Sequence, residues 1–534
     1  MNRFPRLISE LICVGTFSIA AFAQHVQWLQ PNPPAFVGPS DPGCFFRGVI
    51  ADLNGDGISE ILAHGAAQVN NWTGRIVVLS GSDGSVFRVH QGMIPNDFLG
   101  LCGGSIGDVD GDGVADYLTT SQSQGVRIVS GATGIFGPPI SVTCGLWAMG
   151  IGDVNADGRG DFVVSTGACA TAVSGLTSQP LYSICQSPTL NNYFGKVIDV
   201  VGDVDADGYP DYVIGAPTTV PPSFGNVVGH AYLVSGGAGA ILHTWATTGS
   251  WNQFGETVSG IGDVDGDGIS EVLIGAPTYG QAFVYSCAAP YGQVYALTGF
   301  GQTAWGSFGL MSASLGDLDG DGWPDYVLRV ENGVLAVKNG PTGTTLYTLP
   351  TPAGYSLVGL GRAGDTDGDG FEDVFLGLVP FSTTPYWFGG ISSIPVGVIP
   401  FGAGCPQSVG TTARIGATRP PSSAQPFGLT LSQLSPGRPV GLIVGLSSTQ
   451  YLATPLPWDL TTVGVPGCSL LASIDLFLTQ TTGVGTGGSG SAVQTFTIPP
   501  GLTGSTYYAQ WAIENPLGSA TLGSLTRGLS VTIQ

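Results

Sequence analysis

Short apolar runs separated by Gly or Pro recur along most of this chain. Examples are Arg75 to Leu79, Tyr212 to Ile214 and Val272 to Ile274. Runs of this kind, punctuated by turn residues, are typical of β-strands. The 86 Gly and 37 Pro residues disfavour long helices, and 43% of the residues are hydrophobic, which is enough to build cores. We therefore expect an all-β protein.

An acidic pattern of nine residues, such as DVDGDGISE from Asp263, lies between the apolar runs and occurs seven times. The seven copies begin at Asp52, Asp108, Asp153, Asp203, Asp263, Asp317 and Asp365. Successive copies start 45 to 60 residues apart, an interval that suits one four-stranded blade of a β-propeller and exceeds that of a leucine-rich repeat. Each unit is predicted to run as a strand, the acidic loop, a strand, a turn, a strand and a linking strand.

The flanks of the loops repeat as well. Phe254-Gly255 opens the apolar stretch before the fifth copy, Gly275-Ala276-Pro277 follows that copy, and the fourth copy has the same flanks. This order resembles the FG-GAP repeats of the integrin α-subunit β-propeller over about residues 25–400. The resemblance implies a ring of seven blades that the N-terminal segment closes, with Val26 to Leu29 as the candidate closing strand.

The acidic loops have the composition of calcium sites. Positions one, three and five offer side-chain oxygens, position six is always Gly, position seven offers its carbonyl, and position nine is always Asp or Glu. Hard oxygen ligands in a flexible arrangement suit Ca²⁺ better than Mg²⁺, and no loop supplies the Cys or His that zinc favours. An EF-hand would need Glu at position twelve, where Thr119 and Ile214 stand instead.

We therefore predict up to seven Ca²⁺ ions. The expected ligands are Asp52, Asn54, Asp56, Ile58, Glu60, Asp108, Asp110, Asp112, Val114, Asp116, Asp153, Asn155, Asp157, Arg159, Asp161, Asp203, Asp205, Asp207, Tyr209, Asp211, Asp263, Asp265, Asp267, Ile269, Glu271, Asp317, Asp319, Asp321, Trp323, Asp325, Asp365, Asp367, Asp369, Phe371 and Asp373. Seven ions would bring the net charge from −22 to −8. Loops one and three, with Asn54 and Asn155 at position three, are expected to bind most weakly.

Three other patterns suggest chemistry that we weigh against simpler explanations. Arg159-Gly160-Asp161 spells a cell-adhesion tripeptide, but it lies inside the third acidic loop, which needs Asp161 for the metal. Gly103 to Gly107 matches the G-x-S-x-G pattern of hydrolases, but a nucleophile elbow requires a following helix, which the acidic loop replaces. The five His residues form no metal-binding cluster. We predict no catalytic residues.

Aromatic residues are predicted on the face of the ring opposite the acidic loops. In the integrin family that face carries the ligand and partner contacts, and exposed aromatic rings can stack on sugars or anchor proteins. The candidate ligand-binding residues are Trp251, Trp305, Phe224, Tyr279, Tyr386 and Trp387, with Phe283 and Tyr285 on the same predicted connections. Packing between blades is the alternative role for these rings.

Residues 1–23 have the pattern of an export signal, with Arg3 and Arg6 before an apolar run and a cleavage motif at Ala21 to Ala23. No later apolar stretch is long enough to span a bilayer. We expect a secreted protein whose eight remaining Cys residues can form disulfides. The favoured pairs are Cys169–Cys185 and Cys405–Cys468, and the sequence leaves open the pairing of Cys44, Cys102, Cys144 and Cys287.

After the predicted propeller of residues 24–400, the acidic loops stop, and further short apolar runs predict a β-sandwich over residues 401–534. With 15 Lys and Arg against 37 Asp and Glu, the chain lacks the cations that bind nucleic acid. The resulting hypothesis is an extracellular binding or adhesion module for protein or glycan partners. The alternatives are a lectin-like component of a polysaccharide-degrading system and an enzyme with its site in the propeller mouth.

Overall fold

The fold is built from β-strands, which confirms the all-β prediction. The computed structural model describes residues 26–31, 49–56, 58–65, 73–81, 84–140, 147–186, 193–217, 228–247, 253–299, 312–330, 334–349, 355–366, 371–380, 387–391, 398–401, 414–418, 421–422, 426–434, 437–452, 454–463, 469–484, 490–499, 501–514 and 522–533. The helices in these ranges are two short 3₁₀ helices, η4 (Pro277–Tyr279) and η6 (Leu460–Val463). Neither is long and apolar enough to cross a membrane.

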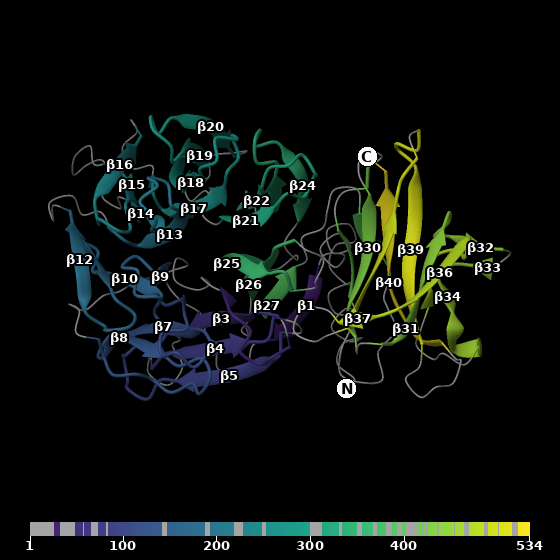
Figure 1. Cartoon of the computed structure of the whole chain (residues 1–534), viewed down its shortest axis with the longest axis horizontal. Helices are drawn as coiled ribbons and strands as arrows, with labels where there is room; N and C mark the ends of the chain where they lie inside the picture. Colours follow the sequence, from purple (N-terminus) through teal and green to yellow (C-terminus); the bar gives the residue numbers. More distant parts are fainter. Residues whose placement is uncertain are drawn as a thin grey trace.

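The first part of the chain forms successive antiparallel sheets, here called blades one to seven, each running outward from its first strand (Figure 1). Blade one contains β2 (Val49–Ile50), β3 (Glu60–Gly65), β4 (Arg75–Leu79) and β5 (Val86–Gln91), and blade two contains β6 (Ser105–Gly107), β7 (Asp116–Ser121) and β8 (Gly125–Val129). Blade three contains β9 (Trp147–Gly152), β10 (Asp161–Ser165), β11 (Cys169–Val173) and β12 (Pro180–Cys185). Blade four contains β13 (Val197–Gly202), β14 (Asp211–Ala216), β15 (His230–Val234) and β16 (Ile241–Ala246). Among the described residues blade two has three strands, and residue 140 adds an isolated bridge beside β8.

Blades five to seven continue the same plan. Blade five contains β17 (Thr257–Gly262), β18 (Glu271–Ala276), β19 (Gln281–Ser286) and β20 (Gln293–Thr298). Blade six contains β21 (Ser312–Gly316), β22 (Asp325–Arg329), β23 (Leu335–Lys338) and β24 (Thr345–Leu349). Blade seven contains β25 (Tyr355–Gly364), β26 (Asp373–Pro380), β27 (Trp387–Ile391) and β1 (Val26–Pro31). The N-terminal strand β1 pairs antiparallel with β27 and completes blade seven, as the resemblance to integrin propellers implies.

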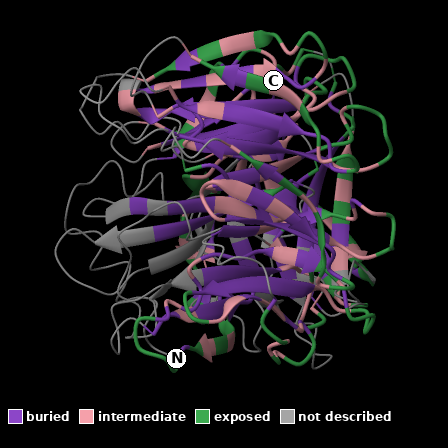
Figure 2. Cartoon of the chain, turned by 90° about the vertical axis from the view of Figure 1, so that its left-hand side faces the viewer, coloured by how far each residue is buried: buried purple, intermediate pink, exposed green. Residues whose placement is uncertain are grey.

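The blades close into a ring. The first strand of each blade contacts the first strand of the next, and β25 of blade seven contacts β2 of blade one. The second strands are covered by neighbouring blades, so that β14 and β18 are buried at every residue, whereas every position of the fourth strand β5 is exposed or half-buried. Seen from the side, buried residues fill most of the strands and exposed residues gather on the connections (Figure 2). Continuous apolar second strands are what a sheet buried on both faces requires.

The turn after the third strand lies directly against the acidic loop of the same blade. A Cβ on Gly236 would lie 2.0 Å from the carbonyl oxygen of Pro210, the eighth residue of the fourth loop. Gly131, Gly175 and Gly340 approach the eighth residue of their own loops in the same way, at 1.9 to 2.0 Å. Only glycine allows this approach, because any side chain there would overlap the loop backbone.

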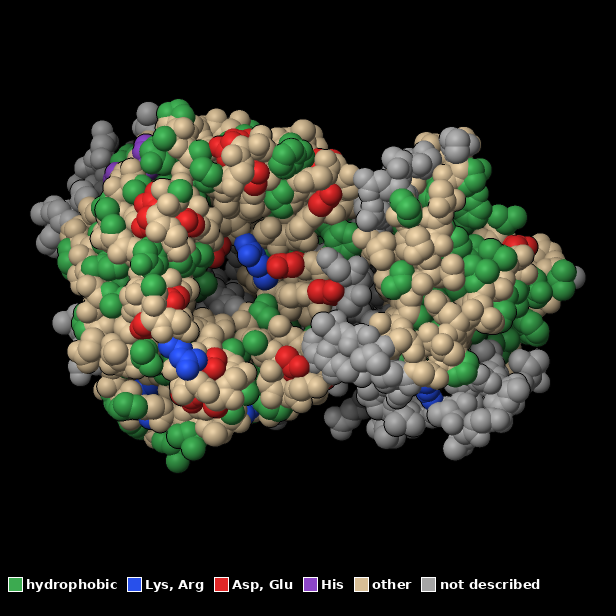
Figure 3. Space-filling view, viewed as in Figure 1, with side chains coloured by type: hydrophobic (Ala, Val, Ile, Leu, Met, Phe, Trp, Pro, Cys, Tyr) green, Lys and Arg blue, Asp and Glu red, His purple; other side chains and the backbone are tan. Residues whose placement is uncertain are grey.

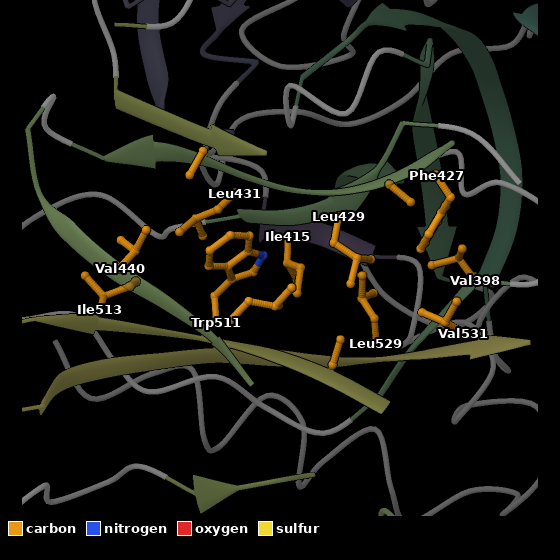
Figure 4. Close-up of a cluster of buried hydrophobic side chains, with 14 of the residues drawn as sticks. Val398, Ile415, Phe427, Leu429, Leu431, Val440, Trp511, Ile513, Leu529 and Val531 are labelled. Carbon is orange, nitrogen blue, oxygen red and sulfur yellow. The ribbon is translucent and has the colours of Figure 1, made fainter. Parts of the chain in front are cut away.

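The second part of the chain forms two sheets that share one hydrophobic core. Its main strands are β28 (Val398–Phe401), β40 (Leu522–Thr532), β39 (Thr506–Glu514), β31 (Pro439–Gly445) and β36 (Leu476–Thr481) in one sheet, and β29 (Arg414–Ala417), β30 (Phe427–Leu434), β38 (Gly490–Phe496) and β37 (Gly483–Val484) in the other. The short pairs are β32 (Gln450–Tyr451) with β33 (Thr454–Pro455), and β34 (Trp458–Asp459) with β35 (Ser469–Leu470). Trp511 is fully buried between Leu431 and Ile415 of one sheet and Ile513 of its own (Figure 4). Since β28 begins at Val398, this unit starts a few residues before position 401.

The glycine contact leads to a stability prediction. We expect Gly236→Ala to lower the free energy of unfolding by about 1–3 kcal/mol, because the new methyl group overlaps the loop backbone. Gly292→Ala is the matched control, since a Cβ at Gly292 meets nothing within 4 Å, and it should change stability by less than about 0.5 kcal/mol. Chemical denaturation of both variants measures the difference, and equal stabilities would contradict the contact.

Candidate metal centres

The acidic loops join the first and second strands of the blades, and in every blade the ninth loop residue is the first residue of the second strand. These ninth residues are Glu60, Asp116, Asp161, Asp211, Glu271, Asp325 and Asp373, and all have 0% exposure. Their burial follows from the fold, because the second strand is covered by blades on both sides. Seven carboxyl groups are therefore buried at one rim of the ring. Acidic side chains are spread around the ring on the face shown in Figure 3, which is hollowed at its centre.

Within a loop, backbone N–H groups hold the side chains of positions one, three and five. In the fourth loop, Asp203 accepts bonds from the N–H groups of positions five and six, at 3.1 and 2.9 Å. Asp205 accepts from position five at 3.1 Å, and Asp207 accepts from Tyr209 at 2.9 Å. The ninth residue, Asp211, accepts from positions two and three at 2.7 and 3.3 Å. The loop therefore wraps around its own carboxylates.

This wrapping brings carboxylates together. In five loops, oxygens of three acidic residues lie within 4.8 Å of one another: Asp52, Asp56 and Glu60; Asp108, Asp110 and Asp116; Asp203, Asp205 and Asp211; Asp263, Asp265 and Glu271; and Asp317, Asp319 and Asp325. In loop seven, residues 367–370 lie outside the described residues, which leaves Asp367 and Asp369 as predictions.

The two loops with Asn at position three place an amide group among the carboxylates. Asn54 Nδ2 donates to Glu60 Oε1 at 2.6 Å and to Asp56 Oδ2 at 3.2 Å. In loop three, Asn155 Nδ2 lies 3.5 Å from Asp161 Oδ1. Because these amide groups occupy carboxylate lone pairs, a cation would have to displace them in order to use the same oxygens.

The position-seven residues have a common geometry. In six loops the N–H of position seven donates to the carboxylate of position five at 2.8 to 3.0 Å, for Ile58, Val114, Arg159, Tyr209, Ile269 and Trp323. This bond fixes the peptide that precedes position seven, the residue whose carbonyl is the predicted ligand. Phe371 of loop seven is buried in the core between blades six and seven.

The buried carboxylates are electrostatically strained without a cation. Burial, followed by the repulsion of neighbouring carboxylates, raises the pKa of Glu271 and of Asp325 to about 7. Burial likewise raises the pKa of Asp211 to about 6. In loop five, Glu271 Oε1 is buried and accepts no hydrogen bond. A buried anionic oxygen without a partner beside two further carboxylates fits a hard cation, and the all-oxygen donor set fits Ca²⁺.

Arg159 links two neighbouring loops. Its Nη1 donates to the carbonyl oxygen of Asp108 at 2.9 Å and lies 3.2 Å from Asp108 Oδ2, in loop two. Its guanidinium also covers Gly111. The Arg-Gly-Asp tripeptide is thus engaged with the preceding loop through Arg159 and with its own loop through Asp161, whose Oδ2 accepts from Val154 at 2.9 Å. Trp323 of loop six similarly lies against Gly266 of loop five.

The aromatic residues predicted on the opposite face are only partly described. Trp251, Trp305, Phe224 and Tyr386 lie outside the described residues. Tyr279 ends η4 and Trp387 begins β27, and the exposure of their side chains is not described. These six residues therefore stay predictions.

Two aromatic residues were placed wrongly by the sequence. Phe283 and Tyr285 lie in strand β19 and not on a connection. Their rings pack against Phe254 at centroid distances of 5.8 and 6.3 Å. The predicted connection was extended to Pro290, where the next proline stands. It therefore included the run from Gln281 to Ser286, although this run alternates as a strand does.

Two further sequence features are resolved. Ser105 begins strand β6, which pairs with β7, so the G-x-S-x-G segment forms no nucleophile elbow. A disulfide joins Cys169 of β11 to Cys185 of β12, with Cα atoms 4.1 Å apart. Cys102 and Cys287 are buried. The other Cys residues, Cys13, Cys44, Cys144, Cys405 and Cys468, lie outside the described residues.

Comparison with known proteins places the chain in a class. The FG-GAP repeat model matches residues 254–297, which lie in blade five. The chain is 30% identical over 209 residues to integrin alpha-5 of Xenopus laevis, covering 34% of this chain and 19% of that protein. It is also 30% identical over 187 residues to integrin alpha-PS2 of Drosophila melanogaster, covering 30% and 12% of the two chains. The match to integrin alpha-V of Gallus gallus is 27% over 225 residues, covering 36% and 21%.

A solved structure of BBS1N in complex with ARL6DN is also similar, with a TM-score of 0.44 and 12% identity over 70% of this chain and 98% of that one. The chain spans about a fifth or less of the three integrins above. The repeated sheets, the acidic loops and the family match define an integrin-α-like FG-GAP repeat protein with a β-propeller. This confirms the resemblance that the sequence suggested.

The raised pKa values predict how stability depends on pH when divalent ions are removed. A carboxyl group whose pKa is higher in the folded than in the unfolded state binds its proton more tightly when folded. The ion-free protein should therefore be most stable below about pH 4 and lose stability as pH rises to about 7.

Thermal melting across this range measures the effect. Asp325→Asn removes one of the titrating groups and should reduce the slope by up to one proton per molecule, whereas excess calcium should flatten the curve. An ion-free protein that becomes more stable as pH rises from about 5 to 7 would contradict the raised pKa values.

Arg159 leads to a separate prediction for loop two. Because its guanidinium pairs with the first carboxylate of that loop, it competes with any cation bound there. We expect Arg159→Ala to tighten cation binding at loop two by about two- to fivefold, the size of a partly exposed charge pair. Its own loop uses only the backbone of this residue and should be unaffected. Calcium titration calorimetry tests this against Arg127→Ala, which removes an Arg in the same half of the ring, and unchanged binding would refute it.

Proposed function

We propose that this protein is a calcium-binding extracellular module, whose propeller holds up to seven Ca²⁺ ions at one rim and binds protein or glycan partners. The observation that carries the proposal is the burial of a carboxylate at position nine of every loop, in five loops beside two further carboxylates. Bound Ca²⁺ would supply positive charge to the carboxylates of this rim, of which Asp108 also pairs with Arg159. The side chains of positions one, three, five and nine would hold it.

Two observations support a place outside the cell. The disulfide between Cys169 and Cys185 is typical of proteins that mature in an oxidising compartment. Calcium sites of extracellular modules bind in the range of about 0.1–1 mM, which matches loops that are built from exposed side chains on a rim. The export signal predicted at residues 1–23 is a further part of the proposal.

The similarity to integrin α-subunits supports a binding or adhesion role rather than a catalytic one. We infer that partners bind the face opposite the acidic loops, where the six candidate aromatic residues were predicted. The rim with the loops would then serve stability, and the opposite face would serve recognition. Fold similarity alone does not identify the partner.

Calcium titration with thermal melting tests the proposal. We expect calcium to raise the melting temperature, a chelator to lower it, and Mg²⁺ at equal concentration to have a smaller effect. Asp265→Asn replaces a position-three carboxylate by the amide that loops one and three carry, and should weaken one binding event. Asp459→Asn, at an exposed carboxylate outside the ring, makes the same charge change and should weaken none. Glycan and protein arrays probed with and without calcium then separate the partner classes.

A purified protein that contains no calcium and melts at the same temperature with and without chelator would refute the proposal. Calcium binding without any array partner would refute only its recognition part.

A further inference from the structure

The fourth strand of a blade contacts the turn of the next blade in a repeated way. Tyr182, the third residue of β12, donates its hydroxyl to the carbonyl oxygen of Gly236 in blade four at 2.7 Å. Tyr295, the third residue of β20, donates in the same way to Gly340 in blade six. Arg88, the third residue of β5, donates to Gly131 in blade two at 2.8 Å. The same kind of hydrogen bond, from a fourth-strand side chain to a glycine carbonyl of the next blade, therefore occurs at three blade junctions.

Each of these glycines is also bonded to the acidic loop of its own blade. The N–H of Gly236 donates to Asp211 Oδ1 at 2.8 Å, and the N–H of Gly340 donates to Asp325 Oδ1 at 3.0 Å. Gly131 donates to Asp116 Oδ1 at 2.8 Å. One glycine residue thus receives a bond from the preceding blade through its carbonyl and gives one to the ninth carboxylate through its N–H.

A buried tyrosine after the ninth residue completes the junction. The hydroxyl of Tyr212 lies 3.3 Å from that of Tyr182, and the hydroxyl of Tyr326 lies 3.3 Å from that of Tyr295. In blade two, Tyr117 lies 2.6 Å from His90 of β5. These contacts are buried or half-buried, so water competes little with the hydrogen bonds.

Blade five provides an internal comparison because it is built differently. Its ninth residue is Glu271, Val272 follows where the other three blades have tyrosine, and its turn contains Cys287. Glu271 Oε1 accepts no hydrogen bond. From blade four, His243 stacks on the ring of Tyr291 at 4.5 Å instead of bonding a glycine carbonyl. The glycine link is therefore a feature of particular blades and not of the fold as such.

We propose that Tyr182, Tyr295 and Arg88 are positioning residues for the metal site of the following blade. Each fixes the glycine whose N–H orients the ninth carboxylate, so cation binding in one blade and docking of the preceding blade stabilise each other. Because the coupling is reciprocal, loss of the hydroxyl weakens the cation, and loss of the cation loosens the junction. This inference rests on the calcium function proposed above.

Tyr295→Phe tests the inference at loop six, because it removes only the hydroxyl. Tyr232→Phe is the matched control: Tyr232 is 5% exposed, and its hydroxyl has no hydrogen bond among the described residues. We expect Tyr295→Phe to weaken cation binding at loop six roughly three- to tenfold, the effect of one buried hydrogen bond, and to reduce the calcium-dependent rise in melting temperature. Any change in melting temperature caused by Tyr232→Phe should be the same with and without calcium.

Terbium luminescence sensitised by Trp323 makes the measurement specific. Trp323 is position seven of loop six, and its ring also lies against Gly266 of loop five. Loop five lacks the glycine link, so its component of the titration should stay unchanged while that of loop six weakens. Trp323→Phe identifies the signal that comes from this residue.

The outcomes separate the two proposals. A wild-type protein without calcium-dependent melting overturns the calcium function, and the positioning role with it. Wild-type calcium dependence with an unchanged loop-six component in Tyr295→Phe overturns the positioning role alone. An equal loss of melting temperature with and without calcium in Tyr295→Phe also overturns it, since that is the result of a purely structural contact.

Discussion

The structure depends on seven carboxyl groups buried where each second strand begins. The second strand must be apolar and covered on both faces for the blades to pack, yet its first residue is Asp or Glu in all seven blades. Backbone N–H groups of the loop and, in several blades, of the third-strand turn solvate these groups. The charge that remains makes these loops candidate cation sites. The packing of the blades, the shape of the acidic loop and the electrostatics of the rim therefore all depend on the ninth loop residue of each blade.

The rim loops are not independent of one another. Position-seven side chains reach the preceding loop, as Arg159 does to Asp108 and Trp323 does to Gly266. Fourth-strand side chains reach the following turn, as Tyr182 does to Gly236. Blade three is thus connected to both neighbours, to blade two through its acidic loop at the surface and to blade four through its fourth strand. Through such links, a change in one acidic loop is transmitted to the blade beside it.

Much of this arrangement follows from the sequence because it repeats. The invariant Gly at position six and the acidic residue at position nine predict the loops, and the apolar run after Asp211 or Glu271 predicts the buried second strand. The disulfide between Cys169 and Cys185, which lie 16 residues apart, was also predicted. The bond from Tyr295 to Gly340 could not be predicted in this way, since it joins residues 45 positions apart whose meeting depends on the angle between blades. Phe283 was misplaced because the predicted connection was extended to Pro290, past the strand that begins after Gly280.

The pairing of β1 with β27 has a consequence for biosynthesis. The two strands lie about 360 residues apart in the chain, so the first of them emerges from the ribosome long before its partner exists. At elongation rates of about 5–20 residues per second, it waits roughly 20 to 70 seconds. During that interval its sheet edge is exposed, and blade seven is incomplete. The ring can therefore close only after β27 has been synthesised, and until then β1 lacks the strand that it pairs with.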